Sequence, residues 1–345
     1  MDPRTPALLL PLLRRPRTVL NLLRWRVLRG VRGERVPFLP LVLDIEPTSY
    51  CNFRCTMCHV ADPDFPHTHL SFELFTTIID TNPQLIKIHL QGMGEPLLAP
   101  RVFDMATYAR KRGILVQTTT NGSLLTPARV DALVRCRFTS IGVSLDGACA
   151  QTFEAIRRGG DFKQVTDGAR RLSAALSAAR SPTRLRAWTV VQQANAGELG
   201  AIVDLCHDIG FHELVFQPNL SDWGKVGEHT HDAVSDAAGL SQQLEQACAR
   251  GRSINQRVRV FTGDRYTSAS PCLWPWHSAF IDARGDVVPC CILGDSRICS
   301  LGSLTSTPLR AIWNAPPYRE FRRAHRSGAI PPFCANCYCD TPPRT

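Results

Sequence analysis

Apolar and polar positions alternate in two ways along this chain. Short apolar runs rich in β-branched residues lie at 41–46, 85–91, 114–120 and 141–144, at the stretch that ends near 192, and at 213–218. Longer stretches with apolar residues at helical spacing separate them. This alternation predicts parallel β-strands joined by crossover helices, an α/β fold in which ligands gather at the carboxyl ends of the strands.

Three cysteines follow the first apolar run, in the spacing Cys-x-x-x-Cys-x-x-Cys. They are Cys51, Cys55 and Cys58. Three thiolates cannot complete the four-ligand shell of a structural zinc ion, but they can hold three irons of a 4Fe-4S cluster and leave the fourth iron open for chemistry. A chance grouping, or a zinc site completed by His59, is the alternative interpretation.

Polar residues also follow the later runs. Glu95 lies in Gly-Met-Gly-Glu-Pro after the second run, and Asn121 precedes a glycine after the third. Ser144 and Asp146 end the fourth run. Asn-Gly and Asp-Gly pairs are common turn formers, so each pair alone is weak evidence of a site. A turn gives no reason for the carboxylate of Glu95.

Taken in order, these motifs resemble the radical S-adenosylmethionine (SAM) enzymes. The resemblance implies a partial (β/α)6 TIM-like barrel, in which the cluster held by the three cysteines cleaves SAM reductively. The resulting 5'-deoxyadenosyl radical removes a hydrogen atom from the substrate. The residues expected to bind SAM are then Gly94, Glu95, Asn121, Ser144, Asp146, Arg157 or its neighbour Arg158, and Gln192.

A second group of cysteines lies near the carboxyl terminus. Seventeen residues separate Cys272 from Cys290, which leaves room for a hairpin turning at 283–285, and Cys334 and Cys337 form a Cys-x-x-Cys pair. This part resembles the SPASM or twitch domains of radical SAM enzymes. The resemblance implies one auxiliary 4Fe-4S cluster with these four ligands, for which Cys291 or Cys339 could substitute. A four-cysteine zinc ribbon is the alternative.

Length and composition set limits. The 345 residues suit one large and one small domain, and we expect an amino-terminal extension at 1–40, a radical SAM core at 41–262 and an auxiliary cluster domain at 263–345. The 14 cysteines are clustered, and cluster thiolates need a reducing compartment, so we expect a cytoplasmic protein. Residues 1–30 are basic and amphipathic, which predicts either a helix on the outside of the barrel or peripheral contact with a membrane surface.

The reaction is less constrained by sequence. An auxiliary cluster that accepts an electron would give oxidation, whereas a thiol that returns a hydrogen atom would give epimerisation. By family analogy we expect a small metabolite, such as a sugar or aminocyclitol, and a reducing partner such as flavodoxin or ferredoxin. The alternatives are modification of a ribosomal peptide and a zinc protein that binds nucleic acid, although no nucleic-acid-binding module is recognisable. The candidate hydrogen donors are Cys149, Cys291, Cys299 and Cys339.

Overall fold

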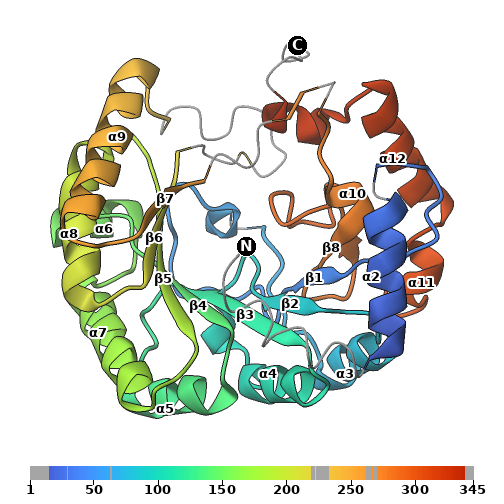
Figure 1. Ribbon diagram of the computed structural model, residues 1–345, viewed down its shortest axis with the longest axis horizontal. Coiled ribbons are helices and arrows are strands. Elements are labelled where there is room, and N and C mark those ends of the chain that lie inside the picture. Colours follow the sequence, from blue (N-terminus) through green and yellow to red (C-terminus); the bar gives the residue numbers. More distant parts are fainter. Residues whose placement is uncertain are drawn as a thin grey trace.

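The computed structural model describes residues 15–28, 30–62, 64–218, 222, 233–261, 266–267 and 270–338. Their strands form one sheet in the order β7-β6-β5-β4-β3-β2-β1-β8-β9, curved so that the helices cover its outer side (Figure 1). The strands are β1 (Val42–Ile45), β2 (Lys87–Leu90), β3 (Leu115–Thr120), β4 (Ser140–Ser144), β5 (Arg184–Val190), β6 (Glu213–Gln217), β7 (Val258–Val260), β8 (Ser278–Ile281) and β9 (Val287–Val288).

The helices begin and end at residues that suit those positions. Ser71 and Thr126 accept a backbone N–H at the helix starts, and Gly210 ends a helix at φ 87°. The α-helices are α2 (Pro16–Leu28), α3 (Phe72–Thr81), α4 (Val102–Lys111), α5 (Pro127–Cys136), α6 (Ala150–Ile156), α7 (Phe162–Ala178), α8 (Leu199–Ile209), α9 (Ala237–Ser253), α10 (Trp274–His277), α11 (Leu309–Ile312) and α12 (Pro316–Ser327). The 3-10 helices are η1 (His59–Ala61), η2 (Pro96–Leu98), η3 (Ala196–Glu198) and η5 (Pro332–Cys337).

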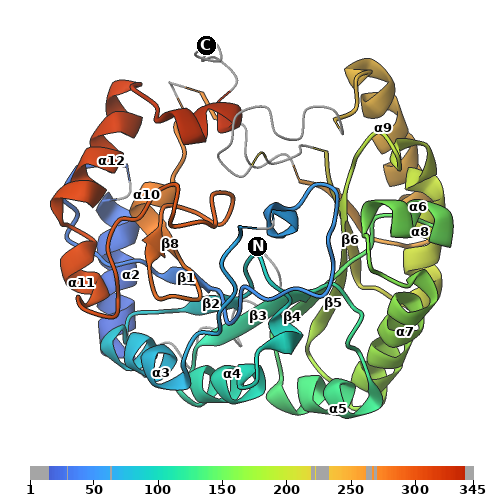
Figure 2. The same ribbon diagram turned by 180° about the vertical axis from the view of Figure 1, so that it is seen from behind.

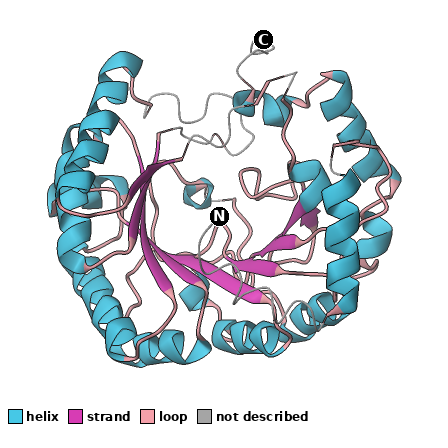
Figure 3. Cartoon of the chain, in the orientation of Figure 1, coloured by secondary structure: helices cyan, strands magenta, loops and turns pink. Residues whose placement is uncertain are grey.

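Strand β2 has one apolar face and one more polar face. In β2, Ile88 and Leu90 are fully buried in the main core, whereas Lys87 and His89 on the other face are partly exposed. Figure 3 shows the helices on the convex side of the sheet. Because successive side chains point to opposite faces, the apolar face of β2 packs against the core under these helices and its polar face lies on the concave side. Strands β1 to β7 are parallel, so their carboxyl ends lie along one edge.

The predicted partial TIM-like barrel is confirmed, and the sheet extends beyond the six expected strands. Strand β7 adds a seventh parallel strand beside β6. Strand β8, from the carboxyl-terminal cysteine region, pairs in parallel with β1, with Ile281 opposite Ile45. Strand β9 then turns back antiparallel to β8. The carboxyl-terminal hairpin is therefore part of the same sheet as the barrel, and its turn lies beside the end of β1.

The segment before β1 packs against the carboxyl-terminal helices. The indole of Trp313 donates to Phe38 O at 2.9 Å, and that of Trp276 donates to Gly33 O at 2.9 Å. Arg322 is fully buried and donates to Pro275 O at 2.8 Å and to Glu34 O at 3.0 Å. A buried guanidinium needs such acceptors. The two ends of the described chain therefore stabilise each other.

Helix α2 lies on the outer side of the barrel, next to α12 and α3 in Figure 1. Its buried Asn21 exchanges two hydrogen bonds with the backbone of Leu39, and Thr18 donates to Pro83 O at 2.8 Å. Residues 1–14 of the predicted extension lie outside the described part. In the part that the structure describes, no helix is both long and apolar enough to cross a membrane.

Candidate active site

The three predicted cluster cysteines lie on the segment that leaves β1 and crosses the concave side of the sheet (Figure 2). Cys55 is 6% exposed, and burial raises the pKa of Cys51 to about 11 and of Cys58 to about 12, with the neighbouring thiols adding to both shifts. Buried thiols of this kind lose their protons when a metal centre compensates their charge. The structure thus brings the three cysteines together, as expected for cluster ligands.

The described His, Cys, Asp and Glu side chains include no group of three or more at the spacing of a single metal ion. A 4Fe-4S cluster binds each cysteine to a different iron, so its ligands do not converge on one point. His59, the fourth ligand of the alternative zinc site, faces Asp295 through Nε2 at 3.1 Å, and its Nδ1 has no hydrogen-bond partner among the described residues.

Glu95 is buried beside the first cysteine. Its carboxylate accepts the Asn121 N–H and the Thr120 hydroxyl, both at 2.6 Å, and its own N–H donates to Tyr50 O at 2.8 Å. Burial raises the pKa of Glu95. A Cβ atom at Gly94 would clash with the carbonyl oxygen of Thr48, so glycine is required where the two loops meet. The predicted Gly94 and Glu95 thus join the loop after β2 to the cluster loop.

Asn121 extends this contact to the cysteines. Its amide donates to Asn52 Oδ1 at 3.0 Å and lies 3.9 Å from Cys51 Sγ. Its side-chain oxygen accepts the N–H and the hydroxyl of Ser123. The end of β3 is therefore tied to the cluster loop through side chains.

Asp146 and Arg157 form an ion pair, with 2.6 Å between Oδ2 and Nε. Asp146 is completely buried, and burial raises the pKa of its carboxyl while the guanidinium opposes this rise. A second nitrogen of Arg157 lies 3.8 Å from Cys55 Sγ. Of the two candidate arginines, Arg157 therefore lies beside the cysteines, whereas Arg158 is exposed. Ser144 ends β4 two residues before Asp146 and is also buried.

Gln192 is 2% exposed beside the cluster loop. Its Oε1 accepts the hydroxyl of Thr56 at 3.4 Å, whereas its Nε2 has no hydrogen-bond partner among the described residues. A buried amide nitrogen without an acceptor carries a desolvation cost, which an acceptor on a ligand would remove. The free Nε2 donor of Gln192 fits an acceptor on a bound nucleoside, such as the one that SAM carries. It lies beside the loop of the three thiols that would hold the cluster.

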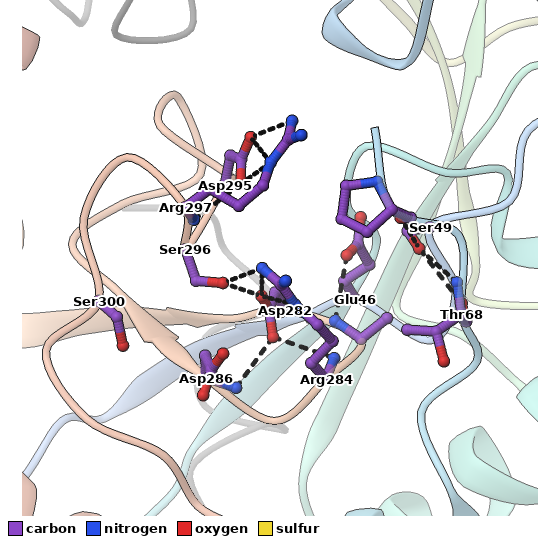
Figure 4. Close-up of polar contacts among 12 residues, drawn as sticks. Glu46, Ser49, Thr68, Asp282, Arg284, Asp286, Asp295, Ser296, Arg297 and Ser300 are labelled. Atoms are coloured by element: carbon purple, nitrogen blue, oxygen red, sulfur yellow. Dashed lines mark hydrogen bonds and ion pairs between the residues drawn. The ribbon is translucent and has the colours of Figure 1, made fainter. Parts of the chain in front are cut away.

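Glu46, which the sequence did not single out as a site residue, follows β1 and reaches two other strand ends. Its buried carboxylate accepts the N–H groups of Met93 at 2.6 Å and Ala283 at 3.1 Å. Figure 4 shows Glu46 beside the hairpin turn that contains Asp282 and Arg284. Ala283 belongs to the turn of the β8–β9 hairpin. Glu46 therefore links the loop after β2 to the carboxyl-terminal region. The signal available in the sequence was a carboxylate at the end of a mostly apolar run.

Titration of Glu46 is expected to affect stability. Burial raises the pKa of its carboxyl from 4.5 to about 8. The folded protein then holds a proton that the unfolded chain releases, so the contribution of this group to stability falls as the pH rises from 4.5 to about 8. Urea unfolding at about pH 6 and pH 9 measures the free energy of unfolding at each pH. Between the two pH values this free energy should fall more for the wild type than for Glu46→Gln, which cannot titrate. Parallel losses in the two proteins would contradict this assignment.

The carboxyl-terminal cysteines also gather. The pKa of Cys334 is raised mainly by burial and further by the thiols of Cys290, Cys337 and Cys272, in that order. Cys299 acts on Cys334 in the same way. The four predicted auxiliary ligands are therefore neighbours, and Cys299, predicted as a hydrogen donor, lies with them.

The hairpin that carries Cys290 turns where the sequence predicts. Asp282 accepts the N–H groups of Arg284 at 3.0 Å and Asp286 at 2.9 Å, and Gly285 takes φ 90° (Figure 4). Such a backbone angle favours glycine. This turn brings β9, and with it Cys290, back beside β8, the strand that pairs with β1.

A buried contact between a histidine and an aspartate connects the two cysteine regions. His59, next to Cys58, lies 3.1 Å from Asp295, and both side chains are almost completely buried. Arg297 pairs with the same carboxylate at 2.7 Å and donates to Asp64 O at 2.7 Å (Figure 4). Sequence analysis missed this contact because Asp295 and His59 are far apart in the chain.

The other candidate hydrogen donors are dispersed. Cys149 is exposed at the start of α6, where its thiol lies 3.5 Å from the Thr152 hydroxyl and 3.6 Å from Glu198. Cys291 contacts the small apolar cluster of the hairpin. Cys339 lies outside the described residues.

One further pair on the concave side was not predicted. His89 Nδ1 lies 2.7 Å from Asp44, and its Nε2 has no hydrogen-bond partner among the described residues. The sequence offered a signal for this pair. Asp44 in β1 and His89 in β2 each stand between two apolar residues, at the alternate positions of a strand that share one face.

Comparison with known proteins agrees with this geometry. Residues 45–180 match the radical SAM superfamily, and residues 272–338 match SPASM, an iron-sulfur cluster-binding domain. Mycofactocin maturase MftC of Mycobacterium ulcerans is 26% identical over 86% of this chain and 80% of its own length. The AdoMet-dependent heme synthase of Methanosarcina barkeri is 26% identical over 82% of this chain and 85% of its own length. The PqqA peptide cyclase of Streptomyces rochei is 27% identical over 86% of this chain and 81% of its own length.

Among solved structures, Streptococcus suis SuiB bound to its precursor peptide SuiA shares the fold. Its TM-score is 0.65 at 15% identity, over 82% of this chain and 67% of that chain.

The expectation of a small-molecule substrate is wrong, because a peptide cyclase and maturases are among the relatives across most of the chain. The number of auxiliary cysteines, on which that expectation rested, does not determine substrate size. The chain belongs to the radical SAM superfamily and carries a SPASM domain, and membership of these families implies an enzyme that uses SAM and 4Fe-4S clusters.

Proposed function

We propose that this enzyme is a maturase that modifies a ribosomally made peptide. The observation that carries the proposal is the similarity to a peptide cyclase and to maturases over 86% of the chain. The contact between His59 and Asp295 supports it, because it joins the loop of the first cysteine group to the loop between Cys290 and Cys299. Both cysteine groups then belong to one site.

In this proposal the first cluster is held by Cys51, Cys55 and Cys58. When bound, it supplies the electron that cleaves SAM to the radical that takes a hydrogen atom from the peptide. Arg157 faces the sulfur of Cys55 and balances its negative charge. The SAM-binding residues are Gly94, Glu95, Asn121, Ser144, Asp146, Arg157 and Gln192.

The auxiliary cluster is held by Cys272, Cys290, Cys334 and Cys337. The position of Cys299 among them makes it the first candidate to replace one of the four. Asp282 and Gly285 form the turn that holds the hairpin beside β1. An electron acceptor at this position would suit an oxidative change of the peptide.

The experiment is to reconstitute the protein anaerobically, reduce it with dithionite and add SAM with a panel of synthetic peptides, taken from any short reading frames found beside its gene and from the SuiA precursor peptide. About eight irons per chain, 5'-deoxyadenosine and a changed peptide mass would support the proposal. SAM cleavage with every peptide unchanged, and with a tetrapyrrole changed instead, would overturn it in favour of the chemistry named for the heme synthase relative.

Replacing Cys337 with alanine separates the two cysteine groups. We expect this variant to release 5'-deoxyadenosine in an uncoupled reaction and to form no modified peptide, because it loses an auxiliary ligand and keeps the first cluster. Cys248→Ala, a substitution on helix α9, is the matched control. Mass spectrometry of the peptide and chromatography of 5'-deoxyadenosine measure both products. Full peptide modification by Cys337→Ala would refute the role of the auxiliary cluster.

A further inference from the structure

A chain of three polar contacts connects two of the proposed auxiliary ligands. The backbone N–H of Cys272 donates to the Tyr338 hydroxyl oxygen at 3.0 Å. That hydroxyl lies 2.8 Å from Nδ1 of His325, and Nε2 of the same ring lies 3.9 Å from Cys334 Sγ. His325 is on α12, so a helix far from the hairpin reaches the cysteine group.

The direction of these hydrogen bonds follows from the two groups at the ends of the chain of contacts, the Cys334 sulfur and the backbone N–H of Cys272. A cysteine bound to iron is a thiolate and can only accept a hydrogen bond, so His325 Nε2 must carry the proton. In a neutral ring Nδ1 is then the acceptor, and it receives the proton of Tyr338. The Tyr338 oxygen keeps its lone pairs for the N–H of Cys272. Every contact in the chain is satisfied by this one arrangement.

The surroundings hold the ring in place. His325 is 3% exposed, the ring of Phe321 meets it edge-on at 4.6 Å, and the ring of Tyr338 stacks on it at 5.8 Å. Aromatic walls exclude water from the ring, which leaves the imidazole few other acceptors and strengthens the hydrogen bond that it makes. The position and the hydrogen-bonding direction of the ring are both determined.

We propose that His325, oriented by Tyr338, donates a hydrogen bond to Cys334 and raises the reduction potential of the auxiliary cluster. The proposal rests on the assignment of Cys334 as a ligand of that cluster. A donor to a ligand sulfur withdraws electron density and favours the reduced cluster, and partners of this kind tune iron-sulfur potentials. His325 is thus a positioning and tuning residue that acts through Cys334.

Two substitutions at His325 separate tuning from simple structural damage. The side-chain oxygen of His325→Asn takes the place of Nδ1 and accepts the Tyr338 proton, so this variant keeps the contact with Tyr338 and loses the donor to Cys334. In His325→Gln the amide reaches the place of Nε2 and keeps that donor. The readout is the midpoint potential of the auxiliary cluster, followed by electron paramagnetic resonance of the full-length reconstituted protein. Added SAM alters the signal of the first cluster and so distinguishes the two.

We expect His325→Asn to lower the ratio of reduced to oxidised cluster about tenfold at a fixed potential, a shift of about 59 mV to a more negative value for one electron. His325→Gln should recover most of this change. Tyr338→Phe, which loses only the hydroxyl, should shift the potential in the same direction by less. His207→Asn, on the exposed side of α8, should leave it unchanged.

Equal potentials in the Asn variant and the wild type, or equal shifts in the Asn and Gln variants, would overturn the proposal. If His325→Asn loses the cluster altogether, the potential of Tyr338→Phe decides: an unchanged value overturns the tuning role and a lowered value supports it. A wild-type protein that binds iron only at the first cysteine group would instead refute the ligand assignment, so the two failures are distinguishable.

Discussion

Cys55→Ala is expected to abolish reductive cleavage of SAM. Cys55 is 6% exposed and faces Arg157, and its substitution removes one of the three proposed ligands of the first cluster. We expect 5'-deoxyadenosine release to fall at least about a thousandfold, which corresponds to about 4 kcal/mol in the barrier. Liquid chromatography of the reaction with dithionite and SAM measures this loss.

The iron content tests the same substitution independently. Cys55→Ala should keep the auxiliary cluster and lose the first, leaving about four of about eight irons. Cys206→Ala would be a poor control because that thiol is fully buried in the core. Cys248→Ala, with a partly exposed thiol on α9, should keep full cleavage and full iron content. Retained cleavage by Cys55→Ala would show that this cysteine is not a ligand.

Asp146→Asn is expected to have the largest effect on stability. The substitution keeps the shape of the side chain and removes the charge that faces Arg157, whose side chain is 11% exposed. Leaving a buried guanidinium without its partner typically costs about 3–5 kcal/mol. Urea unfolding of the cluster-free protein should therefore show a free energy of unfolding lower by about that amount.

An exposed ion pair supplies the matched control. Asp204 lies 2.7 Å from Arg250, but both side chains are about half exposed. Exposed pairs of this kind contribute about 0–1 kcal/mol, so Asp204→Asn should change the free energy of unfolding little. Similar small losses in Asp146→Asn and Asp204→Asn would mean that the buried pair does not hold the ends of β4 and α6 together.

The sequence predicted the barrel and the cofactors because their signals are local. Cys51, Cys55 and Cys58 are close in the chain, and each apolar run of a strand carries its own periodicity. The substrate was predicted incorrectly. Its class was inferred from the number of auxiliary cysteines, whereas similarity over most of the chain favours a peptide.

Contacts between distant residues could not be predicted. His59 looked like a metal ligand because it follows Cys58, yet Asp295 is its partner. Arg157 and Arg158 were equivalent in the sequence, and only burial beside Asp146 distinguishes them. In both cases the decisive partner is a side chain whose position depends on the packing of another element.

The sequence by itself determined the order of strands and helices, the ends of strands at which polar residues occur, and the two groups of cysteines. These follow from hydrophobic periodicity and from spacing over a few residues. The tertiary structure decided that β8 pairs with β1, that Glu46 joins two loops to one carboxylate, and that His325 reaches Cys334. The physical reason is that strand pairing and buried hydrogen bonds depend on which surfaces meet, and local sequence does not encode this.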